Sequence, residues 1–364
     1  MNTSTSSIVL AGVGGSGCGI AGAVAALLGG KTRLALFDTD AATGASEGDG
    51  FFLLGGDRLS GRGSGGDVVA ARLAAEDSAE AIDGAFDGAR LAAIATCLGG
   101  GTGGGSTIEI LKRLSKRGIP SIVFAATPFF FEGEKRQQNA RGTMSMIEDE
   151  ASAAFFLPLD KLVGGEDNMN EALARTRKTL ASAISLFWRL VETPGYIKLD
   201  AERLRQIISN AGRGRFAVAS ATGPDRAREV ARSLVSTPLL SDGTTSVKSI
   251  LCGILAGDDL RLSEIATVAD TLKSAFGEGG SFDLGTVNDE KNFSGSLSAV
   301  AMLFESDGGN APETDRQKRT GGRRKTSTQN TIAKGRFKNA EPTVWKGENL
   351  DIPAYVRKNI SIGR

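Results

Sequence analysis

Short apolar runs alternate with helix-like segments through residues 8–155. The runs have the length of strands and end in Gly, Asp or Pro: SIVLAGV, RLALFDTD, RLAAIATCL and PSIVFAATPF. The segments between them carry apolar residues at helical spacing: GIAGAVAALLGG, DVVAARLAAEDSAEAIDGAF and TIEILKRLSKRG. This alternation predicts an α/β domain in which helices cover both faces of a parallel sheet. Ligands of such sheets bind at the carboxyl ends of the strands.

The pattern changes further along the chain. Residues 168–192 have the spacing of one long central helix, which stops at Thr193, Pro194 and Gly195. From about residue 213, strand-like runs separated by two helical segments predict a smaller α+β domain.

Beyond Glu305 the chain is rich in Gly, Thr, Asn, Lys and Arg, and too few apolar residues remain to offset the entropy of ordering. We expect a disordered linker there, followed by a peptide, NLDIPAYVRKN, that folds onto a partner; a frayed amphipathic end is the simpler alternative. The expected parts are an N-terminal domain 1–167, a central helix 168–192, a C-terminal α+β domain 193–306, a basic linker 307–348 and a C-terminal peptide 349–364.

Composition favours a soluble globular protein, because 40% of the 364 residues are apolar and 23% are charged. No apolar stretch is long enough to span a membrane, and no basic region precedes the first apolar run, so we expect a cytoplasmic protein. Residues 307–340 hold nine Lys/Arg and three Asp/Glu, a net +6 that leaves −5 for the rest of a chain of net +1. The basic linker could attract anionic lipid or simply stay solvated, and we expect no nucleic-acid partner.

The chain contains no histidine, which excludes mechanisms that depend on imidazole, including Ser/His/Asp triads and most zinc hydrolases. Cys18, Cys97 and Cys252 are widely spaced and form no CxxC pair. We therefore expect buried, reduced thiols, and neither disulfides nor a protein-held metal.

Three glycine-rich loops carry the candidate chemistry: GVGGSGCG at 12–19, GRGSGG at 61–66 and LGGGTGGGST at 98–107. Glycine allows backbone amides to converge, and a helix that starts just after such a loop adds its positive end. Phosphate is the ligand that such a loop is best suited to bind. None of the loops reads GxxxxGKS or GxxxxGKT, so a Walker-type site is not supported.

The first loop also contains GxGxxG, and Asp38 follows about twenty residues later, which is the fingerprint of an NAD or flavin enzyme with a Rossmann-like domain. Glycines that serve only tight strand-to-helix turns are a second interpretation of this loop. Neither interpretation explains six glycines among the seven residues 99–105.

GGGTGGG resembles the signature loop GGGTGTG of the tubulin/FtsZ family, with Gly104 in place of the second Thr. Further matches follow in order along the chain, over roughly residues 8–305 and 349–358. They are GVGGSG, FDTDA, PFFFEGEKR, LPLDKLV, TPGYIKLD and the tail LDIPAYVRK, which points to the FtsZ branch. The chain thus resembles a divergent member of that family.

The resemblance implies a GTPase that polymerises head to tail into the filaments of the cell division ring. GTP or GDP, with Mg²⁺, would lie across the strand ends and be covered by the next subunit. The tail, Leu350 to Lys358, would bind membrane-tethering division proteins.

Carried over residue by residue, the resemblance implies the following nucleotide contacts. They are Gly14, Gly15, Ser16 and Gly17; Asp38 and Asp40; Gly63, Ser64 and Gly65; Gly99, Gly100, Gly101, Thr102, Gly103, Gly104 and Gly105; Glu132 and Arg136; and Lys178. For Glu132 and Arg136 the alternative is a surface ion pair.

Lys178 is a departure, because the family has an Asp at this point of the central helix to accept hydrogen bonds from guanine. Lysine only donates, so we expect weakened guanine selectivity unless a register shift brings Asn168 or Asn170 into play.

The second departure concerns hydrolysis, for which the family presents two acids to the neighbouring subunit in NxDFAD. Here the segment reads KLDAER: Asp200 is kept, whereas Lys198 and Arg203 replace the Asn and the second acid, and Glu202 is one residue away. We expect Asp200, Glu202 and Arg203 to act at the neighbour's site, with slow hydrolysis because arginine is no base. The alternatives are a nucleotide-binding filament or copolymer partner with little hydrolysis, completed by a second FtsZ-like subunit, and, more distantly, the NAD or flavin oxidoreductase.

Overall fold

The computed structural model describes residues 7–30, 32–47, 50–162, 168–193, 195–199, 201–209, 211–240, 247–277, 280–305, 344–345 and 348–349. The chain forms two units, Met1–Asn310 and Ala311–Arg364. In the second unit the described part is an antiparallel pair, β11 (Val344–Trp345) with β12 (Glu348–Asn349). Apart from these four residues, the predicted linker 307–348 and peptide 349–364 lie outside the described residues.

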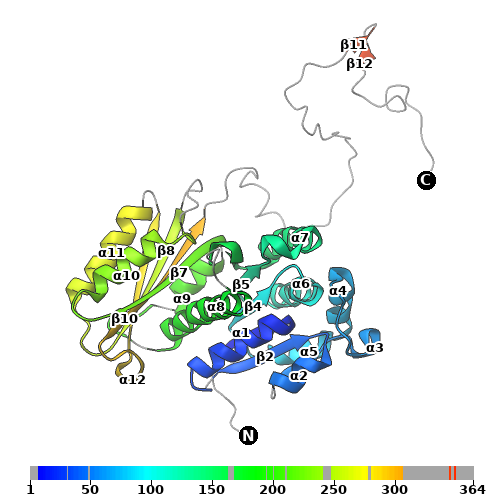
Figure 1. Cartoon of the computed structure of the whole chain (residues 1–364), viewed down its shortest axis with the longest axis horizontal. Helices are drawn as coiled ribbons and strands as arrows, with labels where there is room; N and C mark the ends of the chain where they lie inside the picture. The colour runs from blue at the N-terminus through cyan, green and yellow to red at the C-terminus, as the bar shows by residue number, and fades with distance from the viewer. Residues whose placement is uncertain are drawn as a thin grey trace. The chain divides into compact units, whose positions relative to one another are not determined.

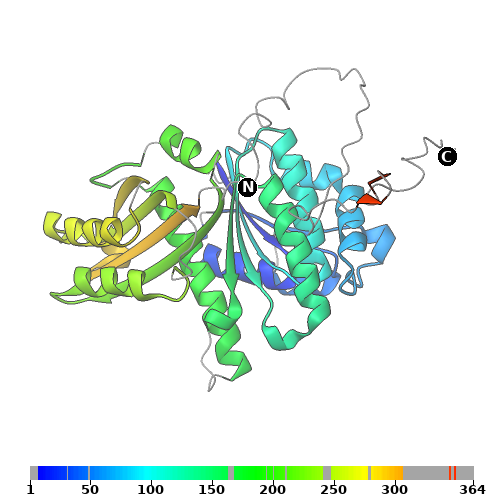
Figure 2. The ribbon, with the colours of Figure 1, turned by 90° about the horizontal axis from the view of Figure 1, so that it is seen from above.

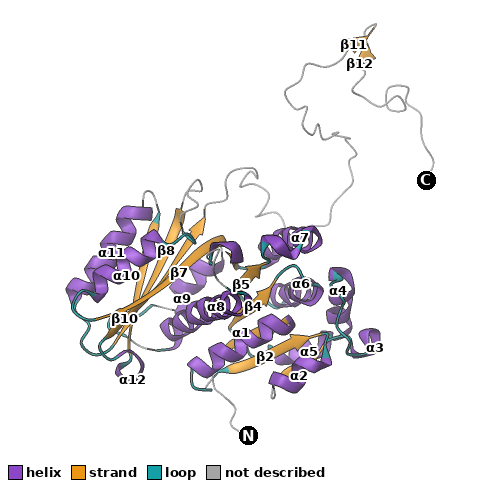
Figure 3. Ribbon diagram, viewed as in Figure 1, coloured by secondary structure: helices purple, strands orange, loops and turns teal. Residues whose placement is uncertain are grey.

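The first unit is built on one continuous sheet of ten strands, in the order β3-β2-β1-β4-β5-β6-β7-β10-β8-β9 (Figures 1 and 3). The seven strands β1 to β7 are mutually parallel. Strand β10 is antiparallel to β7 and β8, and β9 is parallel to β8. This confirms the predicted mixed α/β fold. The strands are β1 Ile8–Val13, β2 Arg33–Asp38, β3 Phe51–Leu53, β4 Leu91–Cys97, β5 Ser121–Thr127, β6 Ala153–Pro158, β7 Gly212–Thr222, β8 Val247–Ala256, β9 Ser281–Asn288 and β10 Ser296–Glu305.

Helices cover both faces of the parallel strands. Successive residues of β1 point to opposite cores: Ile8 and Leu10 face one core, Val9 and Ala11 the other. Two helices lie on the first face, α1 (Gly14–Leu27) and α8 (Met169–Glu192). Four lie on the second: α4 (Val68–Asp77), α5 (Ala79–Ala85), α6 (Gly101–Lys116) and α7 (Glu134–Glu150). Shorter helices in the connections are α2 (Ala41–Glu47), α3 (Gly56–Leu59), α9 (Ala201–Ser209), α12 (Glu290–Phe293), η1 (Phe130–Glu132) and η2 (Leu159–Lys161).

The long helix α8 joins the two halves of the sheet. It starts at a capping box, in which the Asn168 side chain accepts from the Glu171 amide at 3.0 Å. Its buried Leu180, Ile184 and Phe187 belong to a core that includes side chains of β1 to β6 and of β7, β8 and β10. Figure 2 shows the strands of the two halves side by side, with the yellow and orange strands of the second half to the left of the blue and cyan strands of the first. The predicted central helix therefore packs on both halves of the sheet.

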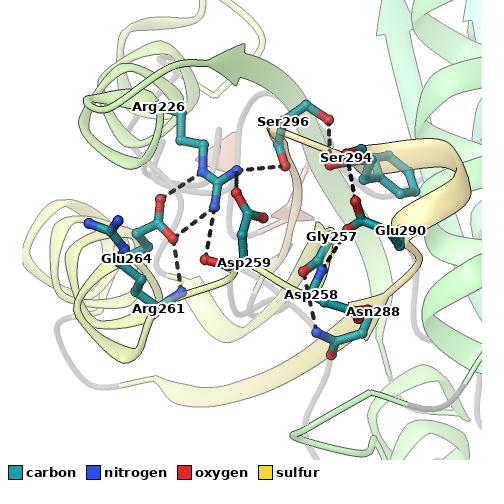
Figure 4. A network of polar contacts seen from close by, with 11 residues as sticks. Arg226, Gly257, Asp258, Asp259, Arg261, Glu264, Asn288, Glu290, Ser294 and Ser296 are labelled. Atoms are coloured by element: carbon teal, nitrogen blue, oxygen red, sulfur yellow. Dashed lines mark hydrogen bonds and ion pairs between the residues drawn. The ribbon is translucent and has the colours of Figure 1, made fainter.

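On the second half, α10 (Arg226–Ser236) and α11 (Leu262–Phe276) cover the opposite face to α8. Arg226 of α10, which is only 4% exposed, links the two helices through ion pairs (Figure 4). Its Nε and Nη2 donate to Glu264 at 2.7 and 3.0 Å, and its Nη1 donates to Asp259 at 2.8 Å. Glu264 also accepts from the Arg261 amide at 2.9 Å, so this ion cluster fixes the start of α11.

Two helices begin earlier than the apolar pattern predicts, inside the glycine-rich stretches. Helix α1 starts at Gly14 and α6 at Gly101. The reason is close packing: a Cβ on Gly17 would lie 2.5 Å from the Ala95 carbonyl oxygen, and one on Gly103 would lie 2.1 Å from that of Cys97. These stretches are therefore largely the first turns of helices rather than open loops. Among the described helices, none is long and apolar enough to cross a membrane.

Candidate functional site

A pocket of about 420 Å³ lies at the carboxyl ends of β1, β2 and β4, where α1 and α6 begin. The three glycine-rich stretches converge on it although they are far apart in the sequence. The predicted contacts that line it are Gly14, Gly15, Ser16, Gly17, Asp38, Asp40, Gly63, Ser64, Gly65, Gly100, Gly101, Thr102, Gly103 and Arg136.

The two helix N-termini give the pocket its affinity for anions. The cap positions of α1 and α6, Val13 and Gly100, make no side-chain hydrogen bond to the helix, and neither first turn contains an acid. The first backbone N–H groups of both helices therefore keep their hydrogen-bonding capacity for a ligand. Two converging positive helix ends suit a phosphate chain.

Hydroxyl groups tie the pocket's walls together. Thr102 Oγ1 is 2.7 Å from Thr39 Oγ1 and 3.3 Å from Ser64 Oγ, so one side chain bridges the walls formed by β2, the second glycine stretch and α6. Asn139 of α7 donates to the carbonyls of Gly66 and Gly99 at 3.2 Å each. Thr39 and Asn139 were not predicted. Their role in joining the pocket walls depends on partners far away in the sequence. Thr39 lies inside the FDTDA segment, but that segment does not show its contact with Thr102.

The acids beside the pocket are already engaged in local structure. Asp38 is 4% exposed and accepts from the Thr39 amide and the Thr43 hydroxyl, both at 2.7 Å. Asp40 accepts from the Ala42 amide at 2.9 Å. Arg62, which also lines the pocket, was not predicted, although it directly precedes the predicted Gly63 in the second stretch. With Arg136 it brings positive charge to the phosphate region.

Glu132 acts behind the pocket wall rather than in it. Its carboxylate accepts from the Phe129 amide at 2.8 Å and from Arg136 Nη1 at 2.5 Å. Arg136 lines the pocket, whereas Glu132 does not. Glu132 therefore positions the guanidinium that faces the ligand.

Three glycines of the signature stretch also lie outside the lining. Gly99 has a φ of +96°, which favours glycine, and it precedes the helix cap. Gly104 faces α7, where an added Cβ would lie 2.6 Å from Thr143 Cγ2, and Gly105 faces α4, where it would lie 2.1 Å from the Val68 carbonyl oxygen. These positions serve helix packing, so the high glycine content reflects close packing as well as phosphate binding.

Lys178 lies away from the phosphate pocket. It lines a separate cavity of about 440 Å³ between α8 and strands β7 and β10, together with Arg175 and Ser182. The preceding residue, Arg177, is not among the residues that line the phosphate pocket. Burial raises the pKa of the Cys97 thiol in the pocket wall to about 12, while a hydrogen bond with Ser16 and the positive charge of Arg177 oppose that rise.

The predicted catalytic segment lies at the opposite end of the sheet. Asp200 itself is outside the described residues. Glu202 lines a cavity at the amino ends of β1, β4 and β5, and Arg203 forms a two-point ion pair with Asp283 of β9, at 2.7 and 2.9 Å. These residues and the glycine pocket cannot meet within one subunit.

No group of three or more Cys, Asp or Glu side chains that could hold a metal occurs among the described residues.

Fold and pocket together are those of a phosphate-binding α/β protein that uses two helix N-termini and no P-loop lysine. Two family models match the chain: "Tubulin/FtsZ family, GTPase domain" over residues 7–165, and "FtsZ family, C-terminal domain" over residues 212–303. The chain belongs to the tubulin/FtsZ family and is a divergent member of it. This assignment leaves no support for the oxidoreductase alternative.

Curated relatives agree. The chain is 30% identical over 240 residues to cell division protein FtsZ of Pseudomonas aeruginosa, across 65% of this chain and 61% of the relative. It is also 30% identical to FtsZ of Pseudomonas putida, across 65% and 60%. The match thus spans about three fifths of the length of these relatives.

Solved structures share the fold. An empty FtsZ dimer of M. jannaschii superposes with a TM-score of 0.76 at 23% identity, covering 82% of this chain and 87% of the other. A GTPγS-bound protofilament of CetZ2 from Haloferax volcanii gives 0.71 at 22% identity, covering 82% and 93%.

Proposed function

We propose that this protein binds GTP or GDP in the glycine pocket and assembles head to tail into filaments of the cell division ring. The observation that carries the proposal is the placement of two complementary surfaces at opposite ends of the same parallel strands. The pocket lies at their carboxyl ends, and the α9 segment with Glu202 lies at their amino ends. Stacking subunits along the strands brings the second surface of one copy over the pocket of the next.

The pocket residues have distinct parts in this proposal. The amides at the starts of α1 and α6 hold the phosphates, while Arg136, positioned by Glu132, and Arg62 balance their charge. Mg²⁺ would be held chiefly by the nucleotide and water. That relatives are solved as a dimer and as a protofilament supports self-association.

Hydrolysis is proposed to be slow. Asp200 of the neighbouring subunit would orient the attacking water. Arg203 stands where the family has a second acid, and its ion pair with Asp283 supports a role in holding α9 against β9 rather than in the reaction. Losing one of two acids lowers the rate without removing the nucleotide site.

Guanine selectivity is proposed to be weak. Neither Lys178 nor Arg177 can accept a hydrogen bond from a base, and the Asn168 side chain is engaged as the cap of α8. The tail, residues 350–358, is proposed to bind membrane-tethering proteins at the division site; it lies outside the described residues.

Sedimentation or light scattering of the full chain with GTP, GDP, ATP or no nucleotide tests assembly, and phosphate release in the same tube tests turnover. We expect assembly with GTP and phosphate release that is slow and lower still in Asp200→Ala. Release should rise several-fold in Arg203→Asp combined with Asp283→Asn, because the second change avoids setting two carboxylates against each other. Brisk wild-type release would contradict slow turnover, and assembly that ignores nucleotide would contradict the proposed function.

A second candidate is a copolymer partner that binds nucleotide and turns over only beside a related subunit. The Arg203–Asp283 pair favours this second candidate. Arg203 replaces the second acid, so the negative charge that the family presents to its neighbour at this position is absent. Filaments that form only when a second FtsZ-like protein is added would distinguish it from self-assembly.

A further inference from the structure

Two exposed phenylalanines lie on the same face as the glycine pocket. Phe130 and Phe131 of η1 are 82% and 63% exposed, whereas Phe129 before them is 2% exposed. Phe131 stacks on Phe129 at 5.0 Å between ring centroids, so Phe130 is the freely projecting side chain. Arg136, in the same segment, lines the pocket. An aromatic exposed to this degree beside a binding site indicates an interface.

The other end of the sheet carries a matching cavity of about 510 Å³. It opens between the amino ends of β1, β4 and β5, helix α9 and the last turn of α8. Arginines and Glu202 line its polar part. Its apolar lining consists of Ile8, Leu91, Ile119, Val191, Leu204 and Ile208.

The exposed aromatic and the cavity lie at opposite ends of one strand. Strand β5 runs from Ser121 to Thr127; Pro120, just before it, lines the cavity, and Phe130 stands three residues after its end. When identical subunits repeat along the strands, the surface at the end of β5 in one copy meets the surface at its start in the next.

Each of the two surfaces also carries a charged side chain that forms no ion pair within the described residues, and the two charges are opposite. The Asp160 carboxylate accepts from the Phe130 amide at 3.1 and 3.2 Å, and it has no ion pair within the described residues. At the cavity, Arg117 and Arg205 are paired within their own subunit, with Asp83 and Asp87 and with Glu202. Arg90 lines the same cavity, and no ion pair engages its guanidinium in the described part of the chain.

We propose that Phe130 inserts into the β1/β4/β5 cavity of the next copy of this chain and that Asp160 pairs there with Arg90 of that copy. The inference rests on the proposed head-to-tail assembly and names the contact that holds it together. An aromatic anchor in an apolar cavity, flanked by one ion pair, is the arrangement that concentrates binding energy in protein interfaces.

The test is the critical concentration for GTP-dependent assembly of the full chain, measured by sedimentation. We expect Phe130→Ser to raise it at least tenfold, while Met146→Ser, which changes another exposed apolar side chain on α7, leaves it unchanged. Asp160→Arg and Arg90→Asp should each raise it, and the double variant should return to within a few-fold of the wild type. Asp160→Asn, which keeps an acceptor for the Phe130 amide, should weaken assembly less than Asp160→Arg.

Nucleotide binding by each unassembled variant serves as the folding control and should stay at the wild-type level. If the wild type assembles with GTP and Phe130→Ser assembles equally well, or if the double reversal is no better than either single change, this contact is wrong while the proposed function stands. If the wild type itself does not assemble with GTP, both fall together.

Discussion

The contact between Gly104 and Thr143 explains one departure from the family signature. Where the family has a threonine, an added Cβ would lie 2.6 Å from Thr143 Cγ2 and 3.2 Å from its Cβ and Oγ1. Thr143 is 2% exposed and donates to the Asn139 carbonyl at 2.8 Å, so it has little freedom to yield. Gly104 is therefore matched to its close contact with α7.

We expect Gly104→Ala to lower the free energy of unfolding by about 1 to 3 kcal/mol through overpacking. Thr143→Ala in the same chain should recover part of the loss, because it removes the Cγ2 and Oγ1 atoms. Gly142→Ala is the control: nothing lies within 4 Å of its added Cβ in the interior of α7, so stability should rise by about 0.5 to 1 kcal/mol. Urea unfolding measures five chains: the wild type, Gly104→Ala, Thr143→Ala, the double variant and Gly142→Ala. Additive effects of Gly104→Ala and Thr143→Ala would show that the two residues do not conflict.

The sequence predicted some residues of the pocket but not others. The glycine stretches predicted the pocket because their backbone chemistry is local. The roles of Gly104, Asn139 and Arg62 depend on neighbours dozens of residues away, which no local pattern encodes. Similarly, a count along the central helix selected Lys178, but the packing of α8 places this residue at a separate cavity.

At the scale of elements, Arg226 is the central tie between α10, α11 and the turn before α11 (Figure 4). We expect Arg226→Ala to lower the free energy of unfolding by about 3 to 5 kcal/mol at pH 7, because it leaves the Glu264 carboxylate without its partner. Arg228→Ala on the same helix should cost less than about 1 kcal/mol, since its pair with Asp225 is 82% and 65% exposed.

The pH dependence of this effect has a definite sign. Arg226 holds the pKa of Glu264 below its usual range, so the carboxylate adds stability above its unfolded pKa near 4.5 and loses it as pH falls. The gap between wild type and Arg226→Ala should thus narrow from pH 7 toward pH 3. Urea unfolding at both values measures it, and a gap that widens in acid would contradict the assigned role.

Periodicity alone predicted most of the regular elements, because strands buried on both faces and amphipathic helices have distinct patterns. It did not place the starts of α1 and α6, since glycine normally argues against a helix and only close packing makes it favourable here. It also missed α7, whose apolar positions are few because Gln, Asn, Arg and Glu fill its exposed side. The segment 67–86, expected as one helix, divides at Ser78 into α4 and α5.

At the scale of the whole molecule, one sheet carries the nucleotide pocket at one end and the α9 segment at the other. A site shared between stacked subunits requires two such surfaces at opposite ends of the sheet. The strand order that joins both halves into a single sheet was not predicted from the sequence, because strand order depends on long-range pairing. The family resemblance implied a nucleotide site covered by the next subunit, whereas the exposure of Phe130 and the Arg203–Asp283 pair became apparent only in the structure.

The most direct test of the shared site combines two defective variants. Gly100 is the cap of α6 and nothing lies within 4 Å of an added Cβ, so the aspartate of Gly100→Asp would cap the helix and repel phosphate. Gly100→Ala is its matched control. Asp200→Ala keeps the pocket but lacks the residue proposed to act on the neighbour.

Phosphate release is then measured for wild type, each variant alone, and an equimolar mixture of Gly100→Asp and Asp200→Ala. We predict that each variant alone releases phosphate only at the background rate. The mixture should release it at a clear fraction of the wild-type rate, because the intact pocket of one chain meets the intact Asp200 of the other. A mixture that releases no more than the sum of its parts, while both variants co-sediment with wild-type filaments, would contradict it.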